Sequence, residues 1–395
     1  MVGVATVATV VVAGLASLFM AWSIGAGSSG STPFAPAVGA NAISVMRAGF
    51  FVGILGFSGA VLQGQGVTEA VGQELIGGVT LSAAAATVGL LIAAALVAVG
   101  IFAGYPIATA FTVTGAVVGV GLAMGGTPEY GKYAEIVTLW VAVPFVGGGI
   151  AYATARALRG DALEEGLLVP GLAAVVGVIL ANVEFALLGP PDGSASVAAT
   201  VAPVLPVPHV VGVVLVSLAV GLLAGGALAW DVARDQAAAQ RRFLLALGGL
   251  VAFSAGGSQV GLAVGPLTPL LSGFDVPLTA VLVAGGLGLL AGSWTGAPRM
   301  IKALSQDYSS LGPRRSIAAL IPSFAIAQTA IFFGIPVSFN EIIVSAIIGS
   351  GYAAGGGGVS REKMVKTVLA WAGSLVLAFT LGYVAFLGVS VALGL

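Results

Sequence analysis

The chain of 395 residues lacks cysteine and has very few charged side chains. Without cysteine it can form no disulfide, no thiolate metal site and no thiol nucleophile. Only 7% of its residues are charged, whereas a soluble domain of this length has about a quarter. The formal net charge of -1 gives no indication of a nucleic-acid partner. So few charges cannot cover a surface that faces water, and we expect the chain to lie in a lipid bilayer.

Apolar residues make up 58% of the chain, and its mean hydropathy is +1.11. Apolar runs of about 20 residues recur along the whole sequence, each long enough to cross a hydrocarbon layer of ~30 Å. The first run has neither a basic region before it nor a cleavage-like end, so we expect it in the mature protein. The pattern predicts an all-α membrane protein with about twelve spans, near residues 2–24, 46–64, 76–100, 106–124, 133–155, 167–188, 208–230, 243–264, 276–295, 316–333, 336–357 and 367–394.

The basic residues predict how these spans are oriented. If the N-terminus is outside, thirteen of the 14 Lys and Arg residues fall at the inner ends and loops, and only Lys132 falls outside. The positive-inside rule favours this distribution, and one span more or less would destroy it. We therefore expect a multi-pass protein of the cell membrane with both termini outside. The sequence leaves open whether it forms a homodimer.

The chain also repeats itself at a nearly constant offset. The equivalent features lie 230 or 231 residues apart: Gly25 and Gly256, Pro106 and Pro336, Gly119 and Gly349, Trp140 and Trp371. They predict a first five-span repeat in residues 1–157, two linking helices with their loops in 158–242, and a second repeat in 243–395. Because the second copy begins on the opposite side, the copies are inverted, which is typical of secondary transporters with a binding site near the midplane.

Gly, Pro and hydroxyl residues interrupt the apolar pattern at corresponding places in the two copies, residues 25–36 and 256–261. Four hydroxyl residues come directly before Pro33, a residue that favours the first turn of a helix. A helix beginning there would direct free N–H groups and its dipole at an anion. The alternative is that these small residues only allow close helix packing. The predicted anion ligands from these breaks are Ser28, Ser29, Ser31 and Thr32, with Gly257, Ser258 and Gln259.

A second interruption follows Pro106 in the first copy and Pro336 in the second. Here Thr109, Ser338 and Asn340 add hydrogen-bond donors without charge, and we expect them to bind the same anion. Glu341 begins an apolar run, where a carboxylate is costly and indicates a function. It would suit a proton carrier or a cation ligand. The alternative is a side chain that reaches water at the outer interface.

The sequence shows no pattern of a catalytic triad, a metal site or a phosphate-binding loop. We therefore expect no enzyme activity, no catalytic residue, no resident metal and no cofactor apart from a coupling ion, Na⁺ or H⁺. Glu184 and His209 are interpreted as interfacial residues at the ends of two spans.

Short stretches around the interruptions follow one another in a specific order and spacing: AWSIGA at 21–26, AVG at 37–39, VTE at 67–69, FSAGG at 253–257, AVGP at 263–266 and PVS at 336–338. In this order and spacing they resemble the inorganic phosphate transporter (PiT) family, and the resemblance covers both copies. It implies a twelve-helix plan with inverted repeats, and cotransport of phosphate, or sulfate in some members, with a cation.

The chain departs from the family's motifs at the positions that resemble its ion ligands. Ser28 and Gln259 stand where the family has aspartates, which are its sodium ligands by expectation, and Glu341 stands where histidine is usual. Sodium is therefore in question as coupling ion, and Glu341 becomes the candidate proton carrier.

The resemblance implies a secondary active transporter of inorganic phosphate that is coupled to a cation. A sulfate or other oxyanion permease of the same fold stays open, because sulfate carries no proton and needs only donors. An anion channel and a membrane receptor that does not transport are further alternatives.

Overall fold

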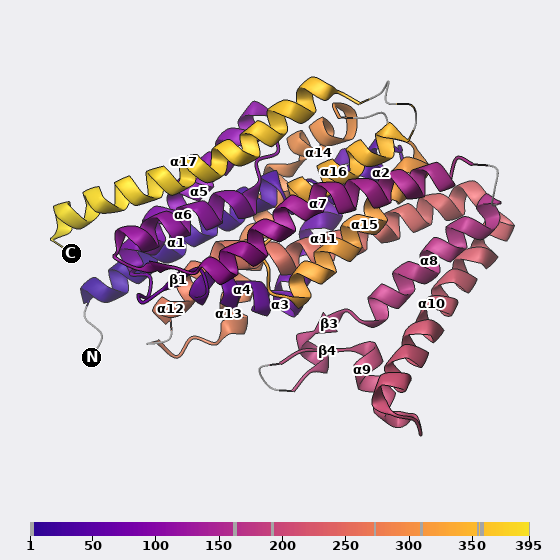
Figure 1. Cartoon of the computed structure of the whole chain (residues 1–395), viewed down its shortest axis with the longest axis horizontal. Helices are drawn as coiled ribbons and strands as arrows, with labels where there is room; N and C mark the ends of the chain where they lie inside the picture. Colours follow the sequence, from indigo (N-terminus) through magenta and orange to yellow (C-terminus); the bar gives the residue numbers. More distant parts are fainter. Residues whose placement is uncertain are drawn as a thin grey trace.

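The computed structural model describes residues 4–160, 164–190, 193–271, 274–308, 311–353, 355 and 359–394 as a bundle of long, oblique helices (Figure 1). The long helices are α1 (Val4–Gly27), α3 (Val45–Gln63), α5 (Ala83–Ala103), α6 (Thr109–Ala123), α7 (Tyr130–Ala157), α8 (Glu165–Ala181), α10 (His209–Arg234), α11 (Gln236–Val264), α13 (Leu278–Thr295), α15 (Pro313–Phe332), α16 (Phe339–Tyr352) and α17 (Arg361–Leu393). The short elements are α2 (Ala35–Gly39), α4 (Gln65–Gln73), α9 (Val197–Val201), α12 (Thr268–Leu271), α14 (Ala297–Gln306), β1 (Ile76–Gly77), β2 (Thr127–Pro128), β3 (Glu184–Phe185) and β4 (Ala195–Ser196), with 3₁₀ turns at Ala186–Leu188, Ala202–Val204 and Gly265–Leu267.

The predicted all-α membrane class is confirmed. Nine helices of the described chain are long and apolar enough to cross a bilayer, and α6 and α8 are shorter apolar helices. Each predicted span overlaps one long helix, while the number of spans stays a prediction. The beginning of α1 and the end of α17 lie at the same end of the bundle (Figure 1).

Several predicted boundaries are wrong, because short polar segments replace helix at the ends. The span predicted to begin at residue 76 begins instead with β1, which pairs antiparallel with β2. Helix α5 starts only after Ser82, whose hydroxyl accepts from Ala85 N. Similarly, α8 ends at Ala181, and β3 and β4 form a second two-stranded hairpin where helix was expected.

The first interruption was predicted in both copies, at residues 25–36 and 256–261, and the helix is broken only at the former. In the first copy α1 ends at Gly27, and turns closed by bonds to Ser28 O lead to α2. In the second copy the prediction was wrong, because α11 runs unbroken to Val264 and bends off only at Gly265. The glycines of α11 serve packing instead: a Cβ at Gly256 would collide with the backbone of Gly56 on α3.

The two halves of the chain exchange equivalent contacts. Helix α6 packs on α17 and α7 packs on α16, while α1 packs on α13 and α3 on α11. Trp140 of α7 donates its indole N–H to Pro336 O at 3.0 Å, and Trp371 of α17 donates to Pro106 O at 2.8 Å. A two-fold relation between two copies would produce this reciprocal pair. The inverted repeat and its boundaries at 157 and 243 stay predictions.

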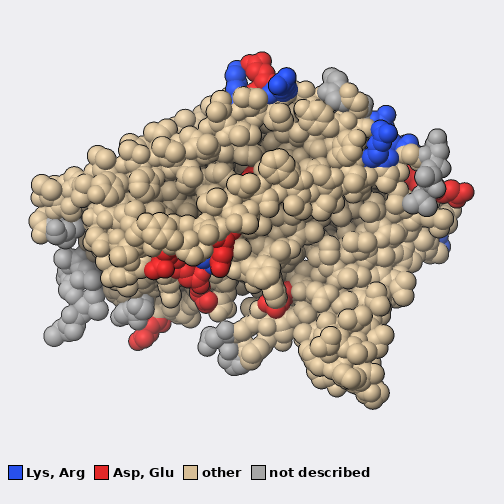
Figure 2. All heavy atoms as spheres, in the orientation of Figure 1, with Lys and Arg blue, Asp and Glu red and all other residues tan. Residues whose placement is uncertain are grey.

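Helices α8 and α10 pair with one another and stand at the edge of the bundle, with the β3–β4 hairpin and α9 at one end (Figure 1). Most of the visible Lys and Arg lie at the top and right edges of the view, acidic side chains gather at its lower left, and most of the visible face is uncharged (Figure 2). Large apolar side chains are exposed on the described surface, among them Phe145 at 75% and Leu222 at 74%. This surface suits lipid rather than water.

Candidate functional site

A buried polar cluster forms where the end of α1, the starts of α6 and α16, and the C-terminal part of α11 meet. Gln259 Oε1 accepts from Thr109 Oγ1 at 2.7 Å and from Ser28 Oγ at 3.2 Å. Thr109 Oγ1 also lies 3.4 Å from Ser28 Oγ. All three side chains are 0% exposed. Positions 231 residues apart, Ser28 and Gln259, are thus bonded directly to one another.

Two amide side chains hold the extended segments before α6 and α16 in place. The Gln259 amide donates to Val337 O, across to the second interruption of its own half. Asn340 donates to Ile107 O at 2.6 Å and to Gly27 O at 2.9 Å, both in the other half. The carbonyl groups of these non-helical segments have no hydrogen-bond donor from a helix. The two side-chain amides donate to them, so these buried backbone groups are not left unpaired.

Four oxygen atoms near this cluster's segments are buried and have no hydrogen-bond partner in the described part of the chain: Ser258 Oγ, Ser338 Oγ, Asn340 Oδ1 and Glu341 Oε2. An unsatisfied buried polar group costs about 1–3 kcal/mol, so a group of them indicates a place that a ligand completes. Ser338 and Glu341 have the spacing of a helix capping box, yet Ser338 makes no side-chain cap bond. Local helix capping therefore does not explain these two side chains.

Glu341 lies in the first turn of α16 and is 1% exposed. The alternative that this carboxyl reaches water at an interface is therefore wrong. Asn340, the residue before it in α16, bonds to the segments that end α1 and precede α6, so Glu341 is next in sequence to a residue of the polar cluster.

The other predicted ligands have different roles. Ser31 and Thr32 are buried, but their hydroxyls donate to Ser28 O at 3.1 Å and so close the turn after α1. Ser29 is buried in the same turn. Gly257 faces α3, where a Cβ would lie 2.7 Å from Gln63 Cβ. The structure thus brings together Ser28, Thr109, Gln259 and Asn340, with Ser258 beside Gln259 and Ser338 at the start of α16.

A second buried polar group, which was not predicted from the sequence, is formed by Gln63, Ser254 and Gln328. A glutamine at the end of α3 and another inside α15 interrupt otherwise apolar helices, and this was the available signal.

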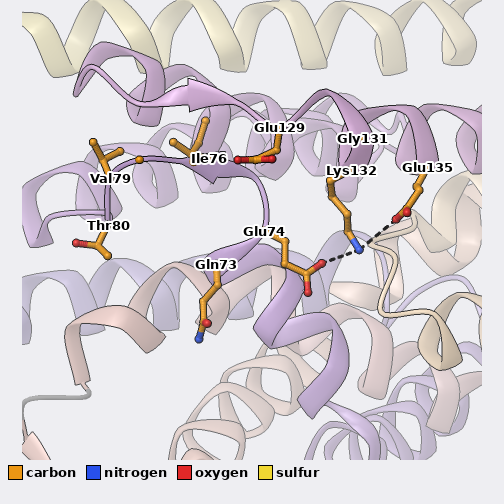
Figure 3. A pocket seen from close by; sticks show the side chains of 11 residues that line it. Gln73, Glu74, Ile76, Val79, Thr80, Glu129, Gly131, Lys132 and Glu135 are labelled. Atoms are coloured by element: carbon orange, nitrogen blue, oxygen red, sulfur yellow. Dashed lines mark ion pairs between the residues drawn. The ribbon is translucent and has the colours of Figure 1, made fainter.

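A pocket of about 900 Å³ lies at the surface, beside β1, β2 and the start of α7 (Figure 3). Lys132 points into it and forms ion pairs with Glu74 at 2.7 Å and Glu135 at 3.5 Å. Glu129 adds a third carboxylate to the lining. One ammonium among three carboxylates does not favour an anion, so this pocket is no candidate for the anion site.

The comparisons with known proteins agree with one another. The phosphate transporter family matches residues 24–382 of this chain. A protein of Thermococcus kodakarensis, named as a candidate phosphate permease, is 25% identical over 381 residues, which cover 89% of this chain and 90% of that protein. The chloroplastic inorganic phosphate transporter 2-1 of Arabidopsis thaliana is 24% identical, over 94% of this chain and 70% of its own. The solved structure of a sodium-dependent phosphate transporter matches with a TM-score of 0.82 and 21% identity, over 97% of this chain and 99% of that chain, which shows a shared fold.

Proposed function

The chain belongs to the phosphate transporter family, and we propose that it carries inorganic phosphate across the membrane as a secondary active transporter. The observation that supports this most is the buried cluster of Ser28, Thr109, Gln259 and Asn340, to which both halves of the chain contribute. A site between two copies of a repeat can be exposed to either side when the copies move. In support of two inverted copies, Trp140 and Trp371 make reciprocal bonds between the halves.

The chemistry of the unpaired oxygens favours phosphate over sulfate. Ser258 and Ser338 have hydroxyl groups that are free to donate to an anion. Asn340 Oδ1 and Glu341 Oε2 are free as well, and an amide or carboxylate oxygen accepts hydrogen bonds. Phosphate still carries a proton near neutral pH and can donate it to such an acceptor, whereas sulfate cannot. A site that holds an acceptor for that proton discriminates against the anion that lacks it.

The proposed coupling ion is a proton carried by Glu341. At the two positions where the family motifs have aspartates, this chain has the neutral side chains Ser28 and Gln259, which bond to each other at 3.2 Å. Glu341 is a carboxylate that is buried in the first turn of α16, next in sequence to Asn340 of the cluster. A lone buried charge is costly, so this carboxyl needs a proton or a cation to neutralise it when the site closes. Sodium is the alternative occupant.

Uptake into proteoliposomes tests the proposed function. We expect saturable accumulation of labelled phosphate. Unlabelled phosphate should compete about tenfold more effectively than sulfate, because sulfate cannot donate the hydrogen bond that phosphate makes, and losing one buried hydrogen bond changes affinity by that order. Stronger competition by sulfate would favour the oxyanion permease. Electrical conductance without accumulation would indicate a channel, and binding without uptake would indicate a receptor.

A further inference from the structure

A second pocket, of about 560 Å³, lies between the α8–β3 segment and the ends of α3 and α15. Since a water molecule takes about 30 Å³ in the liquid, this volume holds a small anion with much of its hydration shell. Its polar lining comes from both sides of the pocket: Gln63, Asn182, Glu184, Ser196, Gln328 and Thr329. Glu184 is the acidic member of this lining, and its carboxylate accepts a hydrogen bond from Ser194 Oγ at 2.7 Å.

Gln63 and Gln328 form a closed pair at this pocket. Gln63 Nε2 donates to Gln328 Oε1 at 3.2 Å, and Gln328 Nε2 donates to Gln63 Oε1 at 3.2 Å. The remaining hydrogens bind on either side, Gln63 to Glu184 O at 2.8 Å and Gln328 to Ser254 Oγ at 2.7 Å. The two glutamines are 7% and 9% exposed, while Ser254 is 0% exposed. The pair therefore separates the pocket from the hydroxyl of α11.

Behind the pair, α11 leads to the central cluster. Ser254 and Ser258 are four residues apart in one helix, which places them on the same face and about 6 Å apart along the axis. Ser258 has the unpaired buried hydroxyl and adjoins Gln259 of the cluster. The side chain of Gln63 packs against Gly257, where a larger residue would collide with it. A Cβ at position 257 would lie 2.7 Å from Gln63 Cβ and 3.5 Å from Gln63 Oε1.

We propose that this pocket is an access route to the buried cluster around Gln259 and that the Gln63–Gln328 pair is its gate. The gate is closed in this structure. The substrate class rests on the proposed function. Two neutral amides suit a gate, because each can turn its N–H groups from its partner to a passing anion without trapping it by charge. The hydroxyls of Ser254 and Ser258 then continue the row of donors toward Gln259.

Thiol labelling tests the gate without requiring transport, and the chain has no native cysteine to interfere. Ser254→Cys places a reporter behind the pair. We expect a charged, membrane-impermeant thiol reagent to label it slowly from the side of the pocket. In the background Gln63→Ala with Gln328→Ala, labelling should be about tenfold faster or more, because opening no longer breaks the two mutual hydrogen bonds. Ser58→Ala is the matched control, since Ser58 lies on α3 like Gln63 but outside the lining of the pocket, and its hydroxyl donates to Ile54 O of its own helix.

Labelling at an equal rate in the paired-alanine and intact backgrounds would overturn the gate. If the alanine variant does not fold, Gln63→Leu with Gln328→Leu removes both amides at similar volume and leaves neither partner of the pair unsatisfied. That variant should lower the initial rate of phosphate uptake several-fold against the Ser58→Ala control, and unchanged uptake would overturn the gate as well. Faster labelling in a protein that takes up no phosphate would support the gate and refute the substrate, so the two proposals can fail separately.

Discussion

Replacement of Glu341 by glutamine tests the coupling that we propose. The change keeps the shape of the side chain and removes its ability to take up and release a proton. Glu341 Oε2 has no hydrogen-bond partner in the described chain, so Glu341→Gln breaks no bond of this atom within the protein. We therefore expect the variant to fold, to bind phosphate with an affinity similar to that of the unmodified protein, and to exchange phosphate across the membrane.

The size of the effect follows from the proton gradient. A pH difference of one unit is worth about 1.4 kcal/mol per proton, so one coupled proton supports at most about tenfold accumulation. Proteoliposomes with a clamped membrane potential and an imposed pH step should show accumulation toward this limit with the unmodified protein. With Glu341→Gln the ratio should fall to the value set by phosphate ionisation alone, while counterflow exchange persists.

Glu362→Gln is the matched control, because this carboxylate lies on the surface at the start of α17 and pairs with Lys366. The Glu362→Gln variant should accumulate phosphate under the pH step to the same ratio as the unmodified protein. Equal accumulation by Glu341→Gln and the unmodified protein would refute proton transfer by Glu341. Accumulation that follows a sodium gradient and ignores the pH step would assign the coupling to a cation instead.

Three further predictions concern the site and the arrangement of the halves. Ser258→Ala should lower phosphate affinity several-fold without lowering the melting temperature of the phosphate-free protein, because its buried hydroxyl has no partner within the described chain and one donor to the anion is worth about 1 kcal/mol. Isothermal titration and thermal unfolding in detergent check this, and unchanged affinity would move the site elsewhere. Trp140→Phe and Trp371→Phe should each cost about 1–3 kcal/mol of stability through an unpaired proline carbonyl, to a similar extent in thermal unfolding if the halves are equivalent. Gln73→Cys and Gln306→Cys, both at exposed positions, should react with an impermeant thiol reagent from opposite sides of the membrane, and reaction from one side would contradict the inverted repeat.

Much of the fold could be predicted because a bilayer allows few solutions. Lipid offers no hydrogen bonds, so each apolar run had to be a helix, and the low content of charge identified the class directly. The boundaries were less certain, since local polar groups decide them. Ser82 caps α5 later than the hydropathy indicated, and residues 76–77 join a hairpin whose partner strand at 127–128 is distant in sequence.

The candidate site could be predicted in part for a related reason. Polar residues that interrupt an apolar run need partners, and Ser28, Thr109 and Gln259 provide them for each other. The roles of Ser31 and Thr32 could not be predicted, because a hydroxyl can bond its own backbone as readily as a ligand. The continuous course of α11 through its glycines could not be predicted either, because glycine is equally suited to a break and to a close helix contact.

Hydropathy and charge act along the chain, and they are sufficient to predict the class of the protein, the approximate place of its helices and the positions where polar groups interrupt them. Which of those polar groups meet depends on the folded arrangement. Gln259 reaches Ser28 over 231 residues, and Gln63 reaches Gln328 over 265. Such pairs depend on how helices cross in space, and hydrogen bonding between side chains leaves no periodic pattern in a single sequence. The burial of Glu341, and with it the proposal for coupling, follows from that packing.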